Sequence, residues 1–256
     1  MSVLHEIIEQ RKKDVAALKK ELSGNPEKNL TDFAAALRRE PEAKLNLIAE
    51  IKRKSPSQGD LKPVLKVEEA VNFYEPYASA LSVLTEPHYF NGSIEDLSTA
   101  SRLTDKPLLR KDFIIDALQI REARFHGASA YLLIVAALSK SQLAELLHAG
   151  QEWNMQALVE VHNERELETA MQVNAAIIGV NNRDLGTLSI DISTVQRVFS
   201  QLSQEEKNRL IMVAESGYKT KEDLATLPDY IDAVLMGTAF MEVASPVNKL
   251  QELFGT

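Results

Sequence analysis

Lysine and glutamate side chains stand at the ends of short apolar runs, where they could transfer protons. In the first of these runs, strand alternation places Glu50 and Lys52 on one face. Further along the chain, Lys111 follows a Leu-Leu-Arg segment and Glu160 follows Ala-Leu-Val. A lysine in a partly apolar cavity beside another ammonium has a lowered pKa, so Lys111 is a candidate proton donor near neutral pH.

Each of these charges also has a plainer interpretation. Glu50 and Lys52 could form an internal salt bridge that only fills space. Lys111 could be a solvated loop lysine, because lysine is among the residues most often exposed. The repetition of the pattern at several run ends favours the chemical interpretation.

Polar segments at three further run ends could hold an anionic small molecule. Asn181 and Arg183 follow one run, and a guanidinium suits bidentate recognition of a carboxylate or phosphate, although the segment could also be an ordinary hydrophilic turn. Two other runs end in glycine beside a hydroxyl residue, at Ser216-Gly217 and Gly237-Thr238. Glycine lets an anion approach backbone N–H groups, but both glycines could equally serve as helix entry turns.

The elements that must position these residues alternate between short apolar strands and helix-length amphipathic stretches. This alternation predicts an α/β fold, a (β/α)8 TIM barrel. In such a barrel the functional residues lie at the carboxyl ends of the strands. An open doubly wound sheet is disfavoured because no G-x-G-x-x-G turn occurs. The expected strands are Leu47–Ile51, Ala80–Leu84, Pro107–Leu109, Ala130–Ile134, Gln156–Val159, Ala176–Val180, Ile211–Val213 and Ala233–Leu235.

A helical extension is expected before the barrel. Apolar residues recur at helical spacing from Leu4 to Leu22 and stop at Ser23–Pro26, and a second short helix is expected from Thr31 to Leu37. No linker composition interrupts the rest. We therefore expect one domain over residues 1–256, with residues 1–44 as the extension.

Composition narrows the classes of partner. The 256 residues carry 29 basic and 37 acidic side chains, a net charge of −8 with no basic block, so no nucleic acid partner is expected. The longest apolar run, 130–138, is far below the ~20 residues that cross a bilayer. The N-terminus lacks the apolar core of a secretory signal, so no membrane partner and a cytoplasmic location are expected.

Several kinds of chemistry find no support in the residue types. The chain has no cysteine, which excludes disulfides, thiolate nucleophiles and cysteine-ligated metals. Its five histidines are scattered without an H-E-x-x-H pattern, so no metal site is expected. His162 is the one histidine near an expected strand end, and it is interpreted as a loop residue.

Taken together, the run ends resemble the indole-3-glycerol phosphate synthase family of tryptophan biosynthesis over nearly the whole length. The resemblance implies a (β/α)8 barrel with an N-terminal helical extension. It also implies a lyase that closes the ring of a carboxyphenylamino-deoxyribulose phosphate with loss of carbon dioxide and water, without metal or organic cofactor. The matching segments are Ile48–Ser57, Ser82–Thr85, Leu109–Asp116, Leu158–His162, Ile178–Leu185, Ala214–Gly217 and Met236-Gly237.

The resemblance also implies roles for individual residues. Lys111 matches the family's general acid, Glu160 its general base, and Lys52 a lysine near the substrate. Phosphate-binding positions are matched by Ser55, Gly217, Gly237 and Thr238, where Thr238 departs from an expected serine. The remaining matches are orienting residues, Glu50, Asn181 and Glu215, and substrate-lining residues, Arg183, Ser216, Phe90, Phe113, Leu132, Leu185 and Leu235.

Two other functions stay open at this point. The first is a phosphate-barrel aldolase that uses Lys111 as a Schiff-base nucleophile. The second is a catalytically silent barrel that binds a metabolite, because fold does not imply function. A phosphoribosylanthranilate isomerase is disfavoured, since it would need a cysteine base. In each case we expect a small sugar-phosphate ligand and a monomer.

Overall fold

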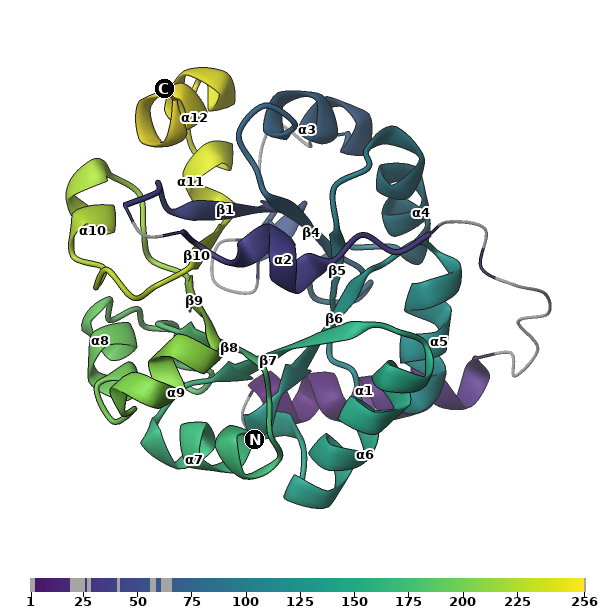
Figure 1. The fold of residues 1–256 in the computed structure, drawn as a ribbon. Coiled ribbons are helices and arrows are strands. Elements are labelled where there is room, and N and C mark those ends of the chain that lie inside the picture. The colour runs from purple at the N-terminus through teal and green to yellow at the C-terminus, as the bar shows by residue number, and fades with distance from the viewer. Residues whose placement is uncertain are drawn as a thin grey trace.

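The computed structural model describes residues 3–18, 26, 29–40, 42–55, 59–60 and 66–255, except for the side chains of Ser55 and Asp60. Eight parallel strands form a closed barrel in the order β1-β10-β9-β8-β7-β6-β5-β4, with β1 also paired to β4 (Figure 1). The predicted barrel is therefore confirmed. The strands are β1 Asn46–Ile51, β4 Ala80–Leu84, β5 Leu108–Lys111, β6 Ala130–Ile134, β7 Gln156–Val161, β8 Ile177–Asn181, β9 Ile211–Glu215 and β10 Ala233–Met236.

Helices follow the strands and form the outer ring seen in Figure 1. Most begin at a side-chain cap, such as Asp116 before α5 and Ser139 before α6, each in a capping box that satisfies free backbone N–H groups. The helices of the ring are α3 Val67–Tyr74, α4 Ile94–Leu103, α5 Ala117–Phe125, α6 Lys140–Glu152, α7 Glu164–Gln172, α8 Ser193–Phe199, α9 Gln204–Arg209, α10 Lys221–Ala225, α11 Thr238–Met241 and α12 Pro246–Phe254.

Three small elements complete the description. A 3-10 turn, η1 Val135–Ala137, follows β6, and a two-stranded antiparallel hairpin, β2 Lys54–Ser55 and β3 Gly59–Asp60, follows β1. Within the described residues, no helix is both long and apolar enough to cross a membrane.

The N-terminal extension reaches both ends of the barrel. Helix α1 (Val3–Ala17) lies at the carboxyl-terminal end, where its Arg11 donates to Asp112 just after β5. Helix α2 (Phe33–Leu37) lies across the opposite end (Figure 1), where the N–H of Ala34 donates to Gln156 at the start of β7. Phe33 of α2 is fully buried among the inward-facing barrel residues. The predicted stop at residues 23–25 lies outside the described residues.

Strand alternation connects the core to the polar mouth. The barrel interior is filled by residues such as Ile48, Leu109 and Leu158, while their sequence neighbours pack outward against the helices. Two residues after each of these three, the same inward face carries a charged side chain, namely Glu50, Lys111 and Glu160. Strands β5, β7, β8, β9 and β10 extend one or two residues beyond their predicted ends, because backbone pairing continues there.

Candidate active site

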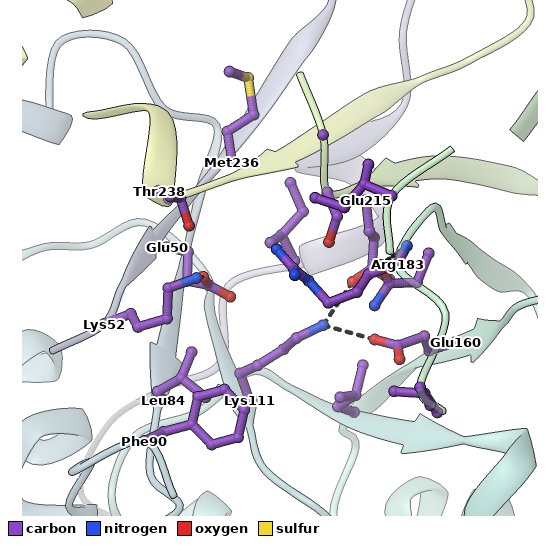
Figure 2. Close-up of a pocket in the computed structure, with 18 of the residues that line it drawn as sticks. Glu50, Lys52, Leu84, Phe90, Lys111, Glu160, Arg183, Glu215, Met236 and Thr238 are labelled. Atoms are coloured by element: carbon purple, nitrogen blue, oxygen red, sulfur yellow. Dashed lines mark hydrogen bonds and ion pairs between the residues drawn. The ribbon is translucent and has the colours of Figure 1, made fainter. Parts of the chain in front are cut away.

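A pocket opens at the carboxyl-terminal mouth of the barrel, and the predicted site residues converge on it. Apart from Ser55, whose side chain lies outside the described part, the structure places all of them in its lining. Figure 2 shows that Lys111 extends toward Glu160 from across the pocket. The predicted residues in the lining are Glu50, Lys52, Phe90, Lys111, Phe113, Leu132, Glu160, Asn181, Arg183, Leu185, Glu215, Ser216, Gly217, Leu235, Gly237 and Thr238.

Lys111 lies at the centre of the charged groups. Its Nζ donates to Glu160 Oε2 at 2.8 Å and to Glu215 Oε2 at 2.6 Å. Burial lowers the pKa of Lys111, but the negative charges of Glu160, Glu215 and Glu50 outweigh burial and raise it above its usual value. The prediction of a lowered lysine pKa was therefore wrong, because the groups in contact with Lys111 are carboxylates and not an ammonium.

The two carboxylates that share Lys111 have opposite pKa shifts. Burial raises the pKa of Glu160, but Lys111 and His162 outweigh burial and lower it, so Glu160 is ionised. Burial and the neighbouring charge of Glu160 raise the pKa of Glu215 to about 7, although Lys111 opposes them. Glu215 Oε1 is buried without a hydrogen-bond partner. One carboxylate can therefore accept a proton and the other can hold one near neutral pH.

Glu50 and Lys52 form an ion pair at the same mouth, on the opposite side of the pocket from Glu160 in Figure 2. Glu50 is on the inward face of β1, two positions after Ile48, and Lys52 follows directly after the strand, on the same side as the alternation predicted. Glu50 is 5% exposed and lies close enough to Lys111 to raise the pKa of the lysine. The pair is therefore part of the pocket electrostatics as well as an internal salt bridge.

The Asn-Asn-Arg segment after β8 serves two purposes. Asn181 lines the pocket, and its side chain accepts the N–H of Arg183 at 3.0 Å. Arg183 lines the pocket too, and its guanidinium donates to the carbonyl of Leu188 at 3.1 Å. Asn182 is buried and ties the β8 and β9 loops together by donating to the carbonyl of Ser216 at 2.9 Å. The segment is therefore a hydrogen-bonded polar turn, and two of its residues, Asn181 and Arg183, also line the pocket.

Glycine occupies the turn after β9 and the turn after β10, both beside the pocket. Gly217 has φ +94°, a left-handed conformation that favours glycine. At Gly237, an added Cβ would lie 2.8 Å from the Cβ of Glu50. Both glycines are thus required by packing, and their backbones also border the pocket beside Thr238.

Apolar side chains form the other walls of the pocket. Phe90 and Phe113 lie with ring centroids 6.1 Å apart, and Leu132, Leu185 and Leu235 continue the apolar surface. An apolar wall in the same pocket as the charged groups suits an aromatic ring attached to a polar chain. Among the described residues, no group of three or more metal-ligating side chains is found.

Comparisons with known proteins identify the family. The family model described as indole-3-glycerol phosphate synthase matches residues 4–253. The chain belongs to this family. It is 46% identical over 250 residues to the indole-3-glycerol phosphate synthase of Chloroherpeton thalassium, covering 93% of this chain and 94% of that one. It is 42% identical over 246 residues to the synthase of Bacillus cereus strain G9842, covering 95% and 94%.

Solved structures show the same fold at much lower identity. The crystal structure of a 3-hexulose-6-phosphate synthase matches with a TM-score of 0.63 at 13% identity, covering 82% of this chain and 98% of that one. KGPDC from Streptococcus mutans matches with a TM-score of 0.59 at 10% identity, covering 82% and 96%. At these identities the likeness concerns the barrel alone.

Sequence reasoning missed part of this family's site in the present chain. Val3, Leu4 and Ile7 of α1 line the pocket, although their spacing predicted only an amphipathic helix with no indication of what it covers. Lys219 and Tyr218 also line the pocket without any motif to single them out. The plainest omission is His162, whose imidazole lies 3.3 Å from Glu160. The available signals were its position one residue after β7 and its place at the end of the family-like segment Leu158–His162.

Proposed function

We propose that this pocket carries out the ring closure of the indole-3-glycerol phosphate synthase family. The substrate is 1-(2-carboxyphenylamino)-1-deoxy-D-ribulose 5-phosphate, and the products are indole-3-glycerol phosphate, carbon dioxide and water. The observation that carries the proposal is the placement of Lys111 between Glu160 and Glu215, opposite an apolar slot and beside two glycine turns. This arrangement brings an acid, a base, an aromatic slot and an anion end into one cavity.

Lys111 is the proposed general acid. As the ring carbon attacks the sugar carbonyl, the developing alkoxide is a stronger base than a lysine amine, so the Lys111 ammonium donates its proton to that oxygen. Glu160 and Glu215 hold the lysine in its charged form until then. Lys52, which lines the same pocket in its pair with Glu50, is placed to stabilise negative charge on the substrate.

Glu160 is the proposed general base. Loss of carbon dioxide restores the aromatic ring, and Lys111 takes up a proton from solvent. Lys111 then gives this second proton to the new hydroxyl group, which leaves as water while Glu160 accepts a proton from the five-membered ring. Glu215 and Asn181 orient these groups. Because two protons go to the departing oxygen and one returns to Glu160, an ionised substrate takes up one proton from solvent in each turnover.

The walls and the rim of the pocket are proposed to bind the two ends of the substrate. Phe90, Phe113, Leu132, Leu185 and Leu235 form the slot for the anthranilate ring, with Arg183 and Ser216 beside it. The backbones of Gly217 and Gly237 and the hydroxyl of Thr238 bind the phosphate, which anchors the reactive end remotely. Ser55 is proposed to join them on the basis of sequence alone.

Formation of indole product tests the proposal directly. Purified protein and the carboxyphenylamino sugar phosphate are followed by ultraviolet absorbance or fluorescence, with a Lys111→Ala preparation as background. Indole absorbance that grows with wild-type protein and not with the variant supports the function. Absence of product from folded protein that still binds the substrate would indicate a binding barrel instead.

A different experiment tests whether the protein is instead an aldolase. A Schiff base needs a neutral amine, whereas two carboxylates hold Lys111 as an ammonium. Borohydride added during turnover should therefore leave Lys111 unmodified, and a trapped covalent adduct would favour the aldolase. We further propose that residues 1–256 act as one domain and as a monomer, which gel filtration at several protein concentrations tests.

A further inference from the structure

Glu160 contacts two cations through different oxygens, and only one of them belongs to the pocket. Oε2 accepts from Lys111 at 2.8 Å, whereas Oε1 lies 3.3 Å from Nε2 of His162. His162 is not among the residues that line the pocket. The imidazole therefore sits behind the base, with Glu160 between it and the reacting groups.

His162 is itself held from its other side. Its Nδ1 lies 3.0 Å from Glu166 Oε2, and its backbone N–H donates to the same oxygen at 2.8 Å. The second oxygen of Glu166 accepts from the side chain of Asn163, the N-cap of α7, at 2.7 Å. The first turn of α7 thus fixes the imidazole, whose Nε2 makes an ion pair with Glu160 and no hydrogen bond.

The groups that face His162 are acidic. Glu160 comes from β7, Glu166 from α7, and Asp184 in the loop after β8 is near enough to be influenced by its charge. Burial lowers the pKa of His162, but Glu160 and Glu166 outweigh burial and raise it to about 10. The imidazole is therefore an imidazolium at neutral pH, and both of its nitrogens are donors.

We propose that His162 is a positioning residue that holds one oxygen of Glu160 and leaves the other oxygen free for Lys111 and the substrate. This inference rests on the proposed function, in which Glu160 is the base. When Lys111 turns to the substrate carbonyl, Glu160 loses its first partner, and His162 is the contact that keeps the carboxylate oriented. Because a small misplacement of a base is costly, the contact affects turnover more than substrate binding.

Kinetic measurements distinguish whether His162 orients Glu160 or only stabilises the fold. His162→Ala is expected to lower kcat roughly 10- to 100-fold with KM within a few-fold, because substrate contacts are retained. His162→Gln keeps a donor amide at the same place and should recover most of kcat. The exposed His148 of α6, changed to Ala, is the matched control and should leave both constants unchanged. Thermal unfolding of each variant verifies that it is folded.

A titration by nuclear magnetic resonance tests the ion pair without activity. The His162 signal, assigned by its loss in His162→Gln, should titrate well above its ordinary pKa of 6.5. Linkage is reciprocal, so Glu160→Gln should lower the pKa of His162 by about one unit or more, and Glu166→Gln should also lower it.

Different results would contradict the role of His162 and the assignment of Glu160 as the base. A kcat for His162→Ala within twofold of wild type, a Gln variant no better than Ala, or a pKa unchanged by Glu160→Gln would each overturn the role of His162. Normal turnover of Glu160→Gln would instead overturn the assignment of the base itself.

Discussion

The two ends of the barrel use buried charges in opposite ways. At the carboxyl-terminal mouth, Lys111, Glu160 and Glu215 contact mainly one another, and Glu215 Oε1 has no hydrogen-bond partner. At the amino-terminal end, Asp232 is also buried, but its two oxygens accept the backbone N–H groups of Met212 at 2.8 Å and Arg39 at 3.0 Å.

The two ends differ in the partners of their buried charged side chains, which are backbone groups at the amino-terminal end and other side chains at the mouth. Arg39 likewise donates to the backbone carbonyls of Ala43 and Ile231. Side chains bonded to the backbone hold the extension against the strands. Side chains bonded to one another at the mouth can exchange a partner for substrate. Substitutions should therefore affect turnover at one end and stability at the other.

The largest effect is expected for Lys111→Ala. Loss of the proposed acid should lower kcat at least ~10²-fold in an indole-formation assay. The variant should also unfold at a lower temperature, because Glu160 and Glu215 lose the cation they share. Lys111→Arg is the matched variant, since it keeps the charge and is a far weaker acid. Turnover near wild type in either folded variant would contradict the acid role.

Glu160→Gln should lower kcat by roughly 10²-fold across the whole pH range, because the amide keeps the shape of the side chain and cannot accept the proton. If Glu160 only balanced the charge of Lys111, the loss at the pH optimum would be small. Full pH profiles of wild type and variant distinguish these outcomes. An optimum within a few-fold of wild type would refute the catalytic assignment.

Gly237→Asp should weaken binding more than turnover. A carboxylate would stand beside the backbone proposed to bind phosphate, and its Cβ would also crowd Glu50. We expect KM to rise at least about tenfold, the effect of losing one charge-assisted hydrogen bond. Gly237→Ala adds only the Cβ, so it shows how much of the effect comes from crowding of Glu50 and how much from the added negative charge. Inorganic phosphate should compete with substrate in wild type, and no competition would show that the anion binds elsewhere.

Asp232→Ala should act at the other end of the barrel. Two buried N–H groups would lose their acceptor, which costs roughly 2–4 kcal/mol of unfolding free energy. The kcat at 25 °C should stay within a few-fold of wild type, because Asp232 lies far from the mouth along the strands. Denaturant unfolding beside the indole assay measures both. Loss of activity without loss of stability would contradict the contrast between the two ends.

The last expected effect concerns the pH dependence of stability. The folded pKa of His162 is raised to about 10 from 6.5, so its contribution is complete below pH 6.5 and disappears as the pH rises toward 10. His162→Gln should therefore flatten the decline of unfolding free energy over this range. Denaturant unfolding at pH 6, 8 and 10 shows the slope. Equal slopes in wild type and variant would mean that the histidine is not an imidazolium in the fold.

Local pattern was sufficient to predict the barrel and most of its mouth. Eight apolar runs with helix-length separations specify parallel strands, and parallel strands bring their carboxyl ends to one edge. Period-two alternation then predicts that Glu50 lies on the same face as Ile48, and the equivalent step predicts Lys111 from Leu109. These are properties of neighbouring residues, so the sequence alone contains them.

Tertiary structure decided which charges touch. Whether Lys111 meets an ammonium or two carboxylates depends on the arrangement of β5, β7 and β9 around the barrel, and this determines the direction of its pKa shift. The role of α1 as a pocket wall and the contact of His162 with Glu160 depend in the same way on packing between segments. Periodicity shows which face of a segment is apolar or charged, but electrostatic energy depends on distances through space, which only the folded chain determines.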